Sequence, residues 1–138
     1  MEVYLDSSAF LSVILQQASR LEQWAVWDRA FTSAVTVIEC RRTIDGVRLE
    51  GHLDDQKVAL AHALLRRLLV GADVVEVTPS ILENAGAPMT TVVKTLDAIH
   101  LVTAQDLRRA QSPHLVFATH DRRQAIAAVA MGFDVIGV

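Results

Sequence analysis

Short apolar runs alternate along the chain with longer segments in which apolar residues recur at helical spacing. The runs predict five strands, over residues 3–5, 31–34, 73–77, 115–118 and 134–136, and the Val-rich third strand is expected to be buried on both faces. The longer segments predict helices over residues 9–16, 21–28, 35–49, 55–70 and 122–131, a short helix beginning at Pro79, and a loop over 84–95. Strands that alternate with helices indicate an α/β fold, a three-layer α/β/α sandwich around a short, mainly parallel sheet.

The stretch over residues 95–104 predicts the helix around which the rest of the chain is organised. No Gly or Pro interrupts it before Pro113, and its apolar residues cover most of the helical circumference, which is typical of a buried helix. Asp97 nevertheless lies in its first turn. A buried, ionised carboxylate is unfavourable without a partner, although an acid at a helix start also caps free N–H groups. Asp97 is therefore either a cap or part of a site, whereas His100 is expected to be a hydrogen-bonded core residue.

The composition is that of one globular domain over residues 1–138. Hydrophobic residues make up 51% of the chain and charged residues 21%, which excludes a disordered chain. A net charge of -3 and an aromatic content of 5% argue against a simple basic DNA-binding module or a base-stacking surface. The single Cys40 excludes an internal disulfide and suits a reducing cytoplasm, and the sequence shows no signal peptide or apolar run of about 20 residues. A soluble, cytoplasmic protein with no membrane partner is expected.

Four acidic residues are expected at the edge formed by the carboxyl ends of the strands, where parallel sheets bind their ligands. Asp6 follows the first strand, and Asp121 follows the fourth strand by a few residues. Glu39 lies one turn into the helix after the second strand, and Asp97 begins the helix that leads to the fourth. Three further acids fall at the opposite ends of their elements and are left out of the site: Asp54, Asp55 and Asp73.

Carboxylates gathered at one edge would destabilise the fold unless protons or a cation offset their charge. Two of them about 4 Å apart repel by roughly 4 kcal/mol at an effective dielectric constant near 20. Oxygen ligands favour Mg²⁺ or Mn²⁺, and the chain has no Cys pair or His-x-x-x-His spacing that would bind zinc. A carboxylate-bound divalent ion is typical of phosphodiester hydrolysis, because it activates a water and stabilises the leaving oxygen.

Other chemistries agree less well with the sequence. No glycine-rich loop follows a strand, which argues against dinucleotide or P-loop nucleotide binding. Ser8 stands two residues after Asp6, where an aspartyl-phosphate hydrolase would carry a second acid. A phosphoacceptor receiver domain also gathers acids at strand ends and stays open as a rival. It needs a Lys at the end of a later strand, and neither Lys57 nor Lys94 is so placed.

Four segments resemble the PIN domain family, and within it the VapC toxins of bacterial toxin–antitoxin pairs: residues 3–9 (VYLDSSA), 37–39 (VIE), 96–101 (LDAIHL) and 117–123 (FATHDRR). Their order and spacing span nearly the whole chain, and the third segment is the most specific. The resemblance implies a PIN-like metal-dependent endoribonuclease that is blocked by a cognate antitoxin and forms a homodimer. It also implies an acidic quartet around Mg²⁺ or Mn²⁺ with two supporting hydroxyl residues: Asp6, Glu39, Asp97 and Asp121, and Ser8 and Thr119.

The resemblance suggests a role for each acid. Asp6 and Asp97 are expected to ligate the metal, Asp121 to ligate it directly or through water, and Glu39 to orient or deprotonate the attacking water. Each residue also has a structural interpretation. Asp6 and Asp121 are good helix caps, and Glu39 lies three residues before Arg42, at the spacing of a helical ion pair.

Arginine pairs near the acids are candidates for contact with RNA phosphates or with an antitoxin: Arg41 and Arg42, Arg108 and Arg109, and Arg122 and Arg123. Each pair is equally well explained as a solvated helix face. His120 is a further residue within reach of a substrate at this edge. The alternative to an enzyme is a catalytically silent PIN-like module that binds an antitoxin or RNA without turnover, and metal-dependent RNA cleavage distinguishes the two.

Overall fold

A computed structural model describes residues 1–17, 24 and 26–138, and its described residues form an all-parallel, five-stranded sheet. The strand order is β3-β2-β1-β4-β5, with strands at Glu2–Leu5 (β1), Arg29–Ser33 (β2), Asp73–Val75 (β3), Val116–Ala118 (β4) and Val135–Ile136 (β5). The chain therefore adds β2 and β3 on one side of β1 and then β4 and β5 on the other. The predicted α/β fold is confirmed.

The helices lie close to their predicted positions: Ser7–Ile14 (α1), Val35–Leu49 (α2), Asp55–Val70 (α3), Pro79–Ala85 (α4), Thr95–Ala110 (α5) and Arg122–Ala130 (α6). The predicted loop before α5 is shorter than expected, because α4 continues to Ala85. Half of the helix predicted over 21–28 falls outside the described residues, and the described half, residues 24 and 26–28, is not helical. No helix in the described part of the chain is both long and apolar enough to cross a bilayer.

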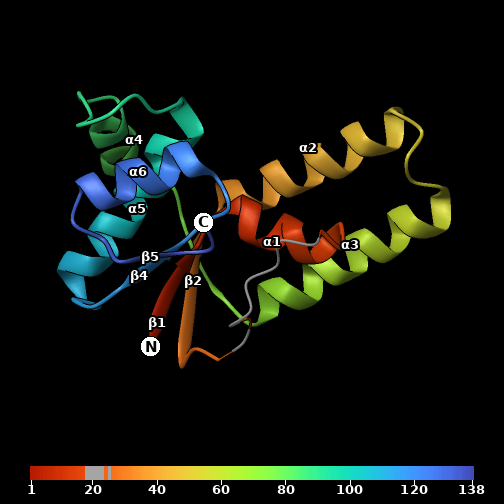
Figure 1. Cartoon of the computed structure of the whole chain (residues 1–138), viewed down its shortest axis with the longest axis horizontal. Helices are drawn as coiled ribbons and strands as arrows, with labels where there is room; N and C mark the ends of the chain where they lie inside the picture. Colours follow the sequence, from red (N-terminus) through yellow and green to blue (C-terminus); the bar gives the residue numbers. More distant parts are fainter. Residues whose placement is uncertain (18–23, 25) are drawn as a thin grey trace.

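Helices cover both faces of the sheet and give the molecule three layers (Figure 1). Side chains alternate along β1, so that Val3 and Leu5 join the core under α1, α2 and α3, whereas Tyr4 joins the core under α5 and α6. The helix α4 packs on α5 through a smaller apolar cluster that contains Ile81 and Ile99. The helices α2 and α3 form a long pair that projects away from the sheet (Figure 1).

The third strand is not buried on both faces, so that prediction is wrong. β3 spans only Asp73–Val75, lies at the edge of the sheet beside β2, and leaves 43% of Val74 exposed. β-branched residues favour an extended backbone whether or not both faces of a strand are covered. The Val content therefore indicates a strand correctly and does not distinguish an edge position from a central one.

The point at which the strand order switches sides lies between β1 and β4. These two strands are paired through Leu5 and Ala118, and the Asp6 N–H donates to the Ala118 carbonyl at 3.2 Å. The helices that follow both strands begin at this edge, because Asp6 caps α1 and Asp121 caps α6 with side chains that accept from the first free amides. Parallel sheets bind ligands at such switch points. Asp6 follows β1 and Asp121 follows β4, so the pairing of these two strands brings two of the predicted acids to the same edge of the sheet.

Candidate active site

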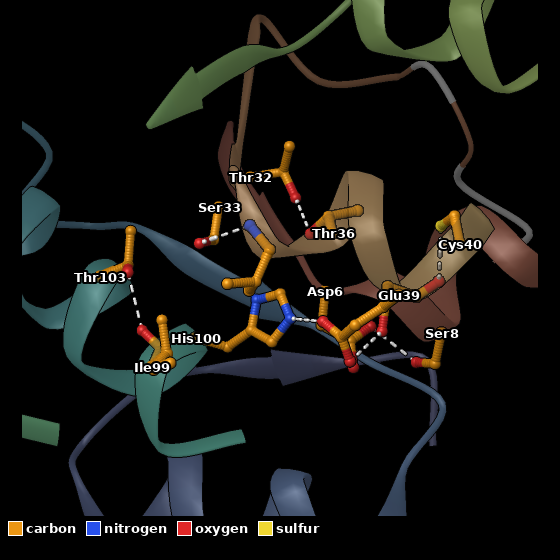
Figure 2. A network of polar contacts seen from close by, with 12 residues as sticks. Asp6, Ser8, Thr32, Ser33, Thr36, Glu39, Cys40, Ile99, His100 and Thr103 are labelled. Atoms are coloured by element: carbon orange, nitrogen blue, oxygen red, sulfur yellow. Dashed lines mark hydrogen bonds and ion pairs between the residues drawn. The ribbon is translucent and has the colours of Figure 1, made fainter. Parts of the chain in front are cut away.

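Asp6 is a buried carboxylate held by two hydroxyl groups. Only 2% of the residue is exposed. The Ser8 hydroxyl donates to Asp6 Oδ1 at 2.6 Å (Figure 2), and the Thr119 hydroxyl donates to Asp6 Oδ2 at 2.7 Å. Each hydroxyl in turn accepts from a backbone N–H of the turn after β4, Ser8 from His120 at 2.8 Å and Thr119 from Asp121 at 3.0 Å. These two relays fix both oxygens of Asp6 relative to the start of α6.

Burial is the largest influence on the acidity of Asp6. It raises the pKa of this carboxyl above its usual value, while hydrogen bonds from Ser8, Thr119 and the Ala9 N–H act to lower it. The ionised form is the one that can ligate a cation. The two hydroxyls therefore stabilise that form at a position where burial disfavours it.

Glu39 reaches the same edge from α2 and is held by a buried histidine. Its Oε1 lies 2.6 Å from His100 Nε2, and its Oε2 accepts from the Ser7 hydroxyl at 3.1 Å (Figure 2 shows the pair of Glu39 and His100). His100 is 1% exposed, and its other ring nitrogen, Nδ1, lies 2.8 Å from the Tyr4 hydroxyl. His100 is thus the hydrogen-bonded core residue that the sequence predicts, and it ties α5 to α2.

Asp97 and Asp121 lie at an open pocket of about 450 Å³, which is also lined by Lys94, His120, Arg122 and Arg123. Burial raises the pKa of Asp97, and the charge of Asp121 raises it further, with a smaller effect in the same direction from Glu39. Asp121 is exposed and uses Oδ1 to cap α6. The charges of Asp121 and Glu39 therefore both act on Asp97 across this edge.

The donor set has the chemistry of a hard-cation site without forming a closed ligand cluster. Among the residues that the structure describes, no three His, Cys, Asp or Glu side chains stand close enough together to hold a metal ion. Asp6, Glu39 and Asp121 are instead each hydrogen-bonded to groups of their own. In the same part of the chain, the ion pairs include neither Asp6, Asp97 nor Asp121. Carboxylate oxygens whose charge no cationic side chain neutralises fit Mg²⁺ or Mn²⁺.

Arg42 of the helix α2 pairs with an acid other than Glu39. It binds Asp45 on its own helix at 3.3 Å, so the structural alternative for Glu39, an ion pair with Arg42, does not explain that residue. The preference has a simple cause, since His100 already occupies one oxygen of Glu39 at 2.6 Å. Arg41 is exposed beside Arg42.

The other predicted arginine pairs differ in what they contact. Arg122 and Arg123 are exposed and line the pocket beside the acids. Arg108 instead lies over the Phe133 ring, 4.0 Å from its centroid, and donates to the carbonyls of Met131 and Gly132 at 2.8 Å. Arg108 is therefore a structural residue that closes the end of α6, which removes it from the candidates for phosphate contact.

Tyr4, Ser7 and Lys94 belong to the site, and the sequence analysis did not find them. The alternation of β1 offered a signal for Tyr4. A residue between two core positions on one face must point to the other face, where a buried phenol needs a hydrogen-bond partner. Ser7 and Lys94 had no comparable sign, because their neighbours come from segments far away in the sequence.

Comparison with known proteins identifies the family. The model of the PIN domain matches residues 3–130 of the chain. The chain belongs to the PIN domain family. This PIN domain is 31% identical over 140 residues to Ribonuclease VapC35 of Mycobacterium tuberculosis, in both strains CDC 1551 / Oshkosh and ATCC 25618 / H37Rv, and the alignment covers 97% of this chain and 95% of the relative.

Solved structures with low sequence identity have the same fold. PAE2754 from Pyrobaculum aerophilum aligns with a TM-score of 0.64 at 18% identity, over 98% of this PIN domain and 83% of its own chain. VapBC2 from Rickettsia felis, bound to a DNA fragment from its promoter, aligns with a TM-score of 0.63 at 11% identity, over 99% and 98% of the two chains. At such identities the likeness establishes the fold alone. Membership of the PIN family removes the receiver domain as a rival.

Proposed function

We propose that this PIN domain is a divalent-metal-dependent endoribonuclease that acts as the toxin of a VapBC-type toxin–antitoxin pair. The observation that carries the proposal is the gathering of the acids Asp6, Glu39, Asp97 and Asp121 at the switch point of the sheet. Ser8 and Thr119 bind Asp6 there, and His100 binds Glu39. The charges of Asp121 and Glu39 act on Asp97. The 31% identity to Ribonuclease VapC35 along 97% of the chain supports the same activity.

The four acids divide into ligands and a residue that acts on water. Asp6, Asp97 and Asp121 would hold Mg²⁺ or Mn²⁺ through carboxylate oxygens, with their side chains drawn closer together than they stand in the structure. When bound, the ion supplies positive charge that offsets the scissile phosphate and acidifies the attacking water. Glu39 orients that water or accepts its proton. Ser8 and Thr119 keep the carboxylate of Asp6 ionised and oriented, through the hydrogen bonds described above.

RNA approaches through the pocket of about 450 Å³ that contains Asp97 and Asp121. The protein has a net charge of -3, so affinity for a polyanion depends on local cations. Lys94, Arg122 and Arg123 line the pocket and are in place to contact phosphates. Arg41 and Arg42, on the exposed face of α2, are further candidates for contact with RNA or with an antitoxin.

The remaining expectations concern partners and location. A cognate antitoxin is the expected protein partner, and the VapBC2 assembly of Rickettsia felis supports that expectation through the shared fold. We also infer a homodimer that works in the cytoplasm.

Metal-dependent RNA cleavage tests the proposal. The purified protein is incubated with ribosomal and transfer RNA in Mg²⁺, in Mn²⁺ and in EDTA, and cut ends are mapped by sequencing. Cleavage is expected with either metal and is expected to vanish in EDTA and in the variants Asp6→Asn and Asp97→Asn. Asp54→Asn is the matched control, because Asp54 caps the far end of the helix pair at the start of α3 and Asn is an equally good cap.

Two results would contradict the proposal. If Asp6→Asn and Asp97→Asn cut RNA as well as the wild type, the assignment of the ligands is wrong. If the folded wild-type protein binds RNA and turns over none of the substrates with any metal, the silent binding module is the correct interpretation. Growth arrest that persists on expression of both variants would place toxicity outside this site.

A further inference from the structure

A buried chain of hydrogen bonds connects the sheet to Glu39 through the central helix. The Tyr4 hydroxyl, on β1, lies 2.8 Å from His100 Nδ1, and His100 Nε2, on α5, lies 2.6 Å from Glu39 Oε1, on α2. Tyr4 is 0% exposed and His100 1% exposed. Figure 2 shows the imidazole of His100 pointing toward the carboxylate of Glu39. Three elements that are far apart in the sequence thus meet at one acid.

The Glu39 carboxylate and the Tyr4 phenol, at the two ends of this chain, determine which atom donates in each hydrogen bond. An ionised carboxylate only accepts hydrogen bonds, so the contact between Glu39 and His100 requires the proton on Nε2. The neutral ring then presents a lone pair at Nδ1, and the Tyr4 hydroxyl must donate to it. Burial raises the pKa of Tyr4 well above its usual value, and the charges of Asp6 and Glu39 raise it further, which keeps the phenol a donor.

We propose that Tyr4 and His100 are positioning residues that fix the carboxylate of Glu39 for its action on the attacking water. The inference rests on the proposed function, in which Glu39 performs that step. The Tyr4 hydroxyl binds Nδ1 of the tautomer that Glu39 requires and holds the imidazole in place, so that its Nε2–H stays directed at Glu39 Oε1. Ser7 binds the other oxygen at 3.1 Å, so the two donors together fix the plane of the carboxylate.

The proposal differs from a purely structural role for the same residues. A buried Tyr–His pair that only joins β1 to α5 would change stability when it is broken, and it would leave the chemical step intact. A positioning role predicts that the loss appears in kcat rather than KM. It also predicts that the loss depends on the presence of the Glu39 carboxylate.

The kinetic test uses Tyr4→Phe, which removes one hydroxyl and keeps the ring stacked on Phe117 at a centroid distance of 5.2 Å. RNA cleavage by Tyr4→Phe is expected to lose about tenfold in kcat, with KM unchanged, as for other residues that orient a reacting group. His100→Leu should lose more, and His100→Gln should recover part of the rate, because a Gln amide can still donate to Glu39. Ser12→Ala is the control, since Ser12 is equally buried and its hydroxyl binds the Ala9 carbonyl at 2.8 Å.

A double-variant cycle separates the two roles. In a Glu39→Gln background, Tyr4→Phe should have no further effect on the residual rate, because the group it positions is gone. A full tenfold loss in that background would show that Tyr4 acts elsewhere and would overturn the proposal. Wild-type kcat in a folded Tyr4→Phe variant would overturn it as well.

A spectroscopic test is independent of activity and metal. Long-range ¹H–¹⁵N correlation spectra of the wild-type protein in EDTA should show His100 as a single tautomer protonated at Nε2. In Tyr4→Phe the ¹⁵N shift of Nδ1 should change, because that nitrogen loses its hydrogen-bond donor. A His100 ring protonated at Nδ1 in the wild type would contradict the proposal. If the wild type cuts no RNA but shows the Nε2 tautomer, the proposed function fails while the hydrogen-bonded chain stands.

Discussion

The hydroxyl of Thr119 offers a direct measure of how strongly the site holds Asp6. Thr119 is 0% exposed, donates to Asp6 Oδ2 at 2.7 Å and accepts from the Asp121 N–H at 3.0 Å. Replacing it by Val keeps the volume and β-branching of the side chain and removes both hydrogen bonds. Packing should therefore change little, and the measured effect reports on the polar contacts.

The size of the effect follows from the groups involved. A hydrogen bond to a charged group contributes about 1.5–3 kcal/mol, and the Asp121 N–H loses its acceptor in addition, so the variant is expected to lose about 2–4 kcal/mol in free energy of unfolding near neutral pH. For a chain of 138 residues this corresponds to a fall in Tm of roughly 8–16 °C. The loss is much larger than that of an exposed pair such as Arg29 and Asp73, which is worth at most about 1 kcal/mol.

The loss should grow with pH, and the sign follows from proton linkage. Burial raises the pKa of Asp6 in the native state above its value of about 3.9 in the unfolded chain. The native state therefore binds more protons than the unfolded state in that interval, and the free energy of unfolding falls as pH rises through it. The Thr119 hydroxyl opposes this rise, so Thr119→Val moves the native pKa higher still and deepens the fall. Below both pKa values the bond to Asp6 is one to a neutral carboxyl, worth about 1 kcal/mol, while the loss of the acceptor of the Asp121 N–H is the same at every pH.

Urea denaturation in EDTA at about pH 3 and at about pH 8 measures the difference. Ser12→Ala, which breaks a buried bond between a hydroxyl and the Ala9 carbonyl, is expected to cost about 1 kcal/mol at both pH values. Thr119→Val should lose more stability at the higher pH than at the lower, whereas the loss for Ser12→Ala should be the same at both. Equal losses for Thr119→Val at both pH values would show that the hydroxyl does not stabilise the charged form of Asp6, and the account of the site given above would be wrong.

Three further predictions concern charge and backbone. Asp97→Asn should raise Tm in EDTA, because it removes a carboxylate that Asp121 repels, and a lower Tm would contradict this. The same variant should no longer gain in Tm when Mg²⁺ is added. Arg122→Gln and Arg123→Gln should each reduce the slope of log affinity for RNA against log salt by about 1, whereas an unchanged slope would remove them from the RNA interface. Gly132→Ala should cost about 1 kcal/mol by urea denaturation, because Gly132 has a φ of +81°; no loss would show that the turn adapts.

The spacing of apolar residues along the chain was enough to predict most of the fold. The helix α5 and the strand β3 show why it succeeded in one case and failed in the other. The helix over residues 95–104 is apolar nearly all round, and the structure buries residues 98–104 without a break. Burial of that extent can be inferred from one segment alone. The exposure of β3 could not be inferred in this way, because it depends on which strand lies beside it. Neighbours in a sheet are set by long-range packing.

In the candidate site, too, features set by nearby residues could be predicted from the sequence, and contacts between residues far apart in the sequence could not. Asp6 and Asp121 were placed at one edge because each follows a strand by a few residues, and parallel strands share that edge. The partner of Glu39 was not predicted. A helical pair with Arg42 satisfies the local spacing, but His100, 61 positions away in sequence, lies 2.6 Å from the carboxylate.

One carboxylate can both cap a helix and ligate a metal ion. From the sequence alone the two roles look like alternatives. A carboxylate has about four lone-pair sites. Asp6 accepts from Ser8 and the Ala9 N–H through Oδ1 and from Thr119 through Oδ2, which leaves one site on Oδ2. Asp121 accepts two amides, both through Oδ1. The caps thus orient each carboxylate while part of its capacity stays available to a cation, and Asn at either position should keep the capping function and lose the ligand.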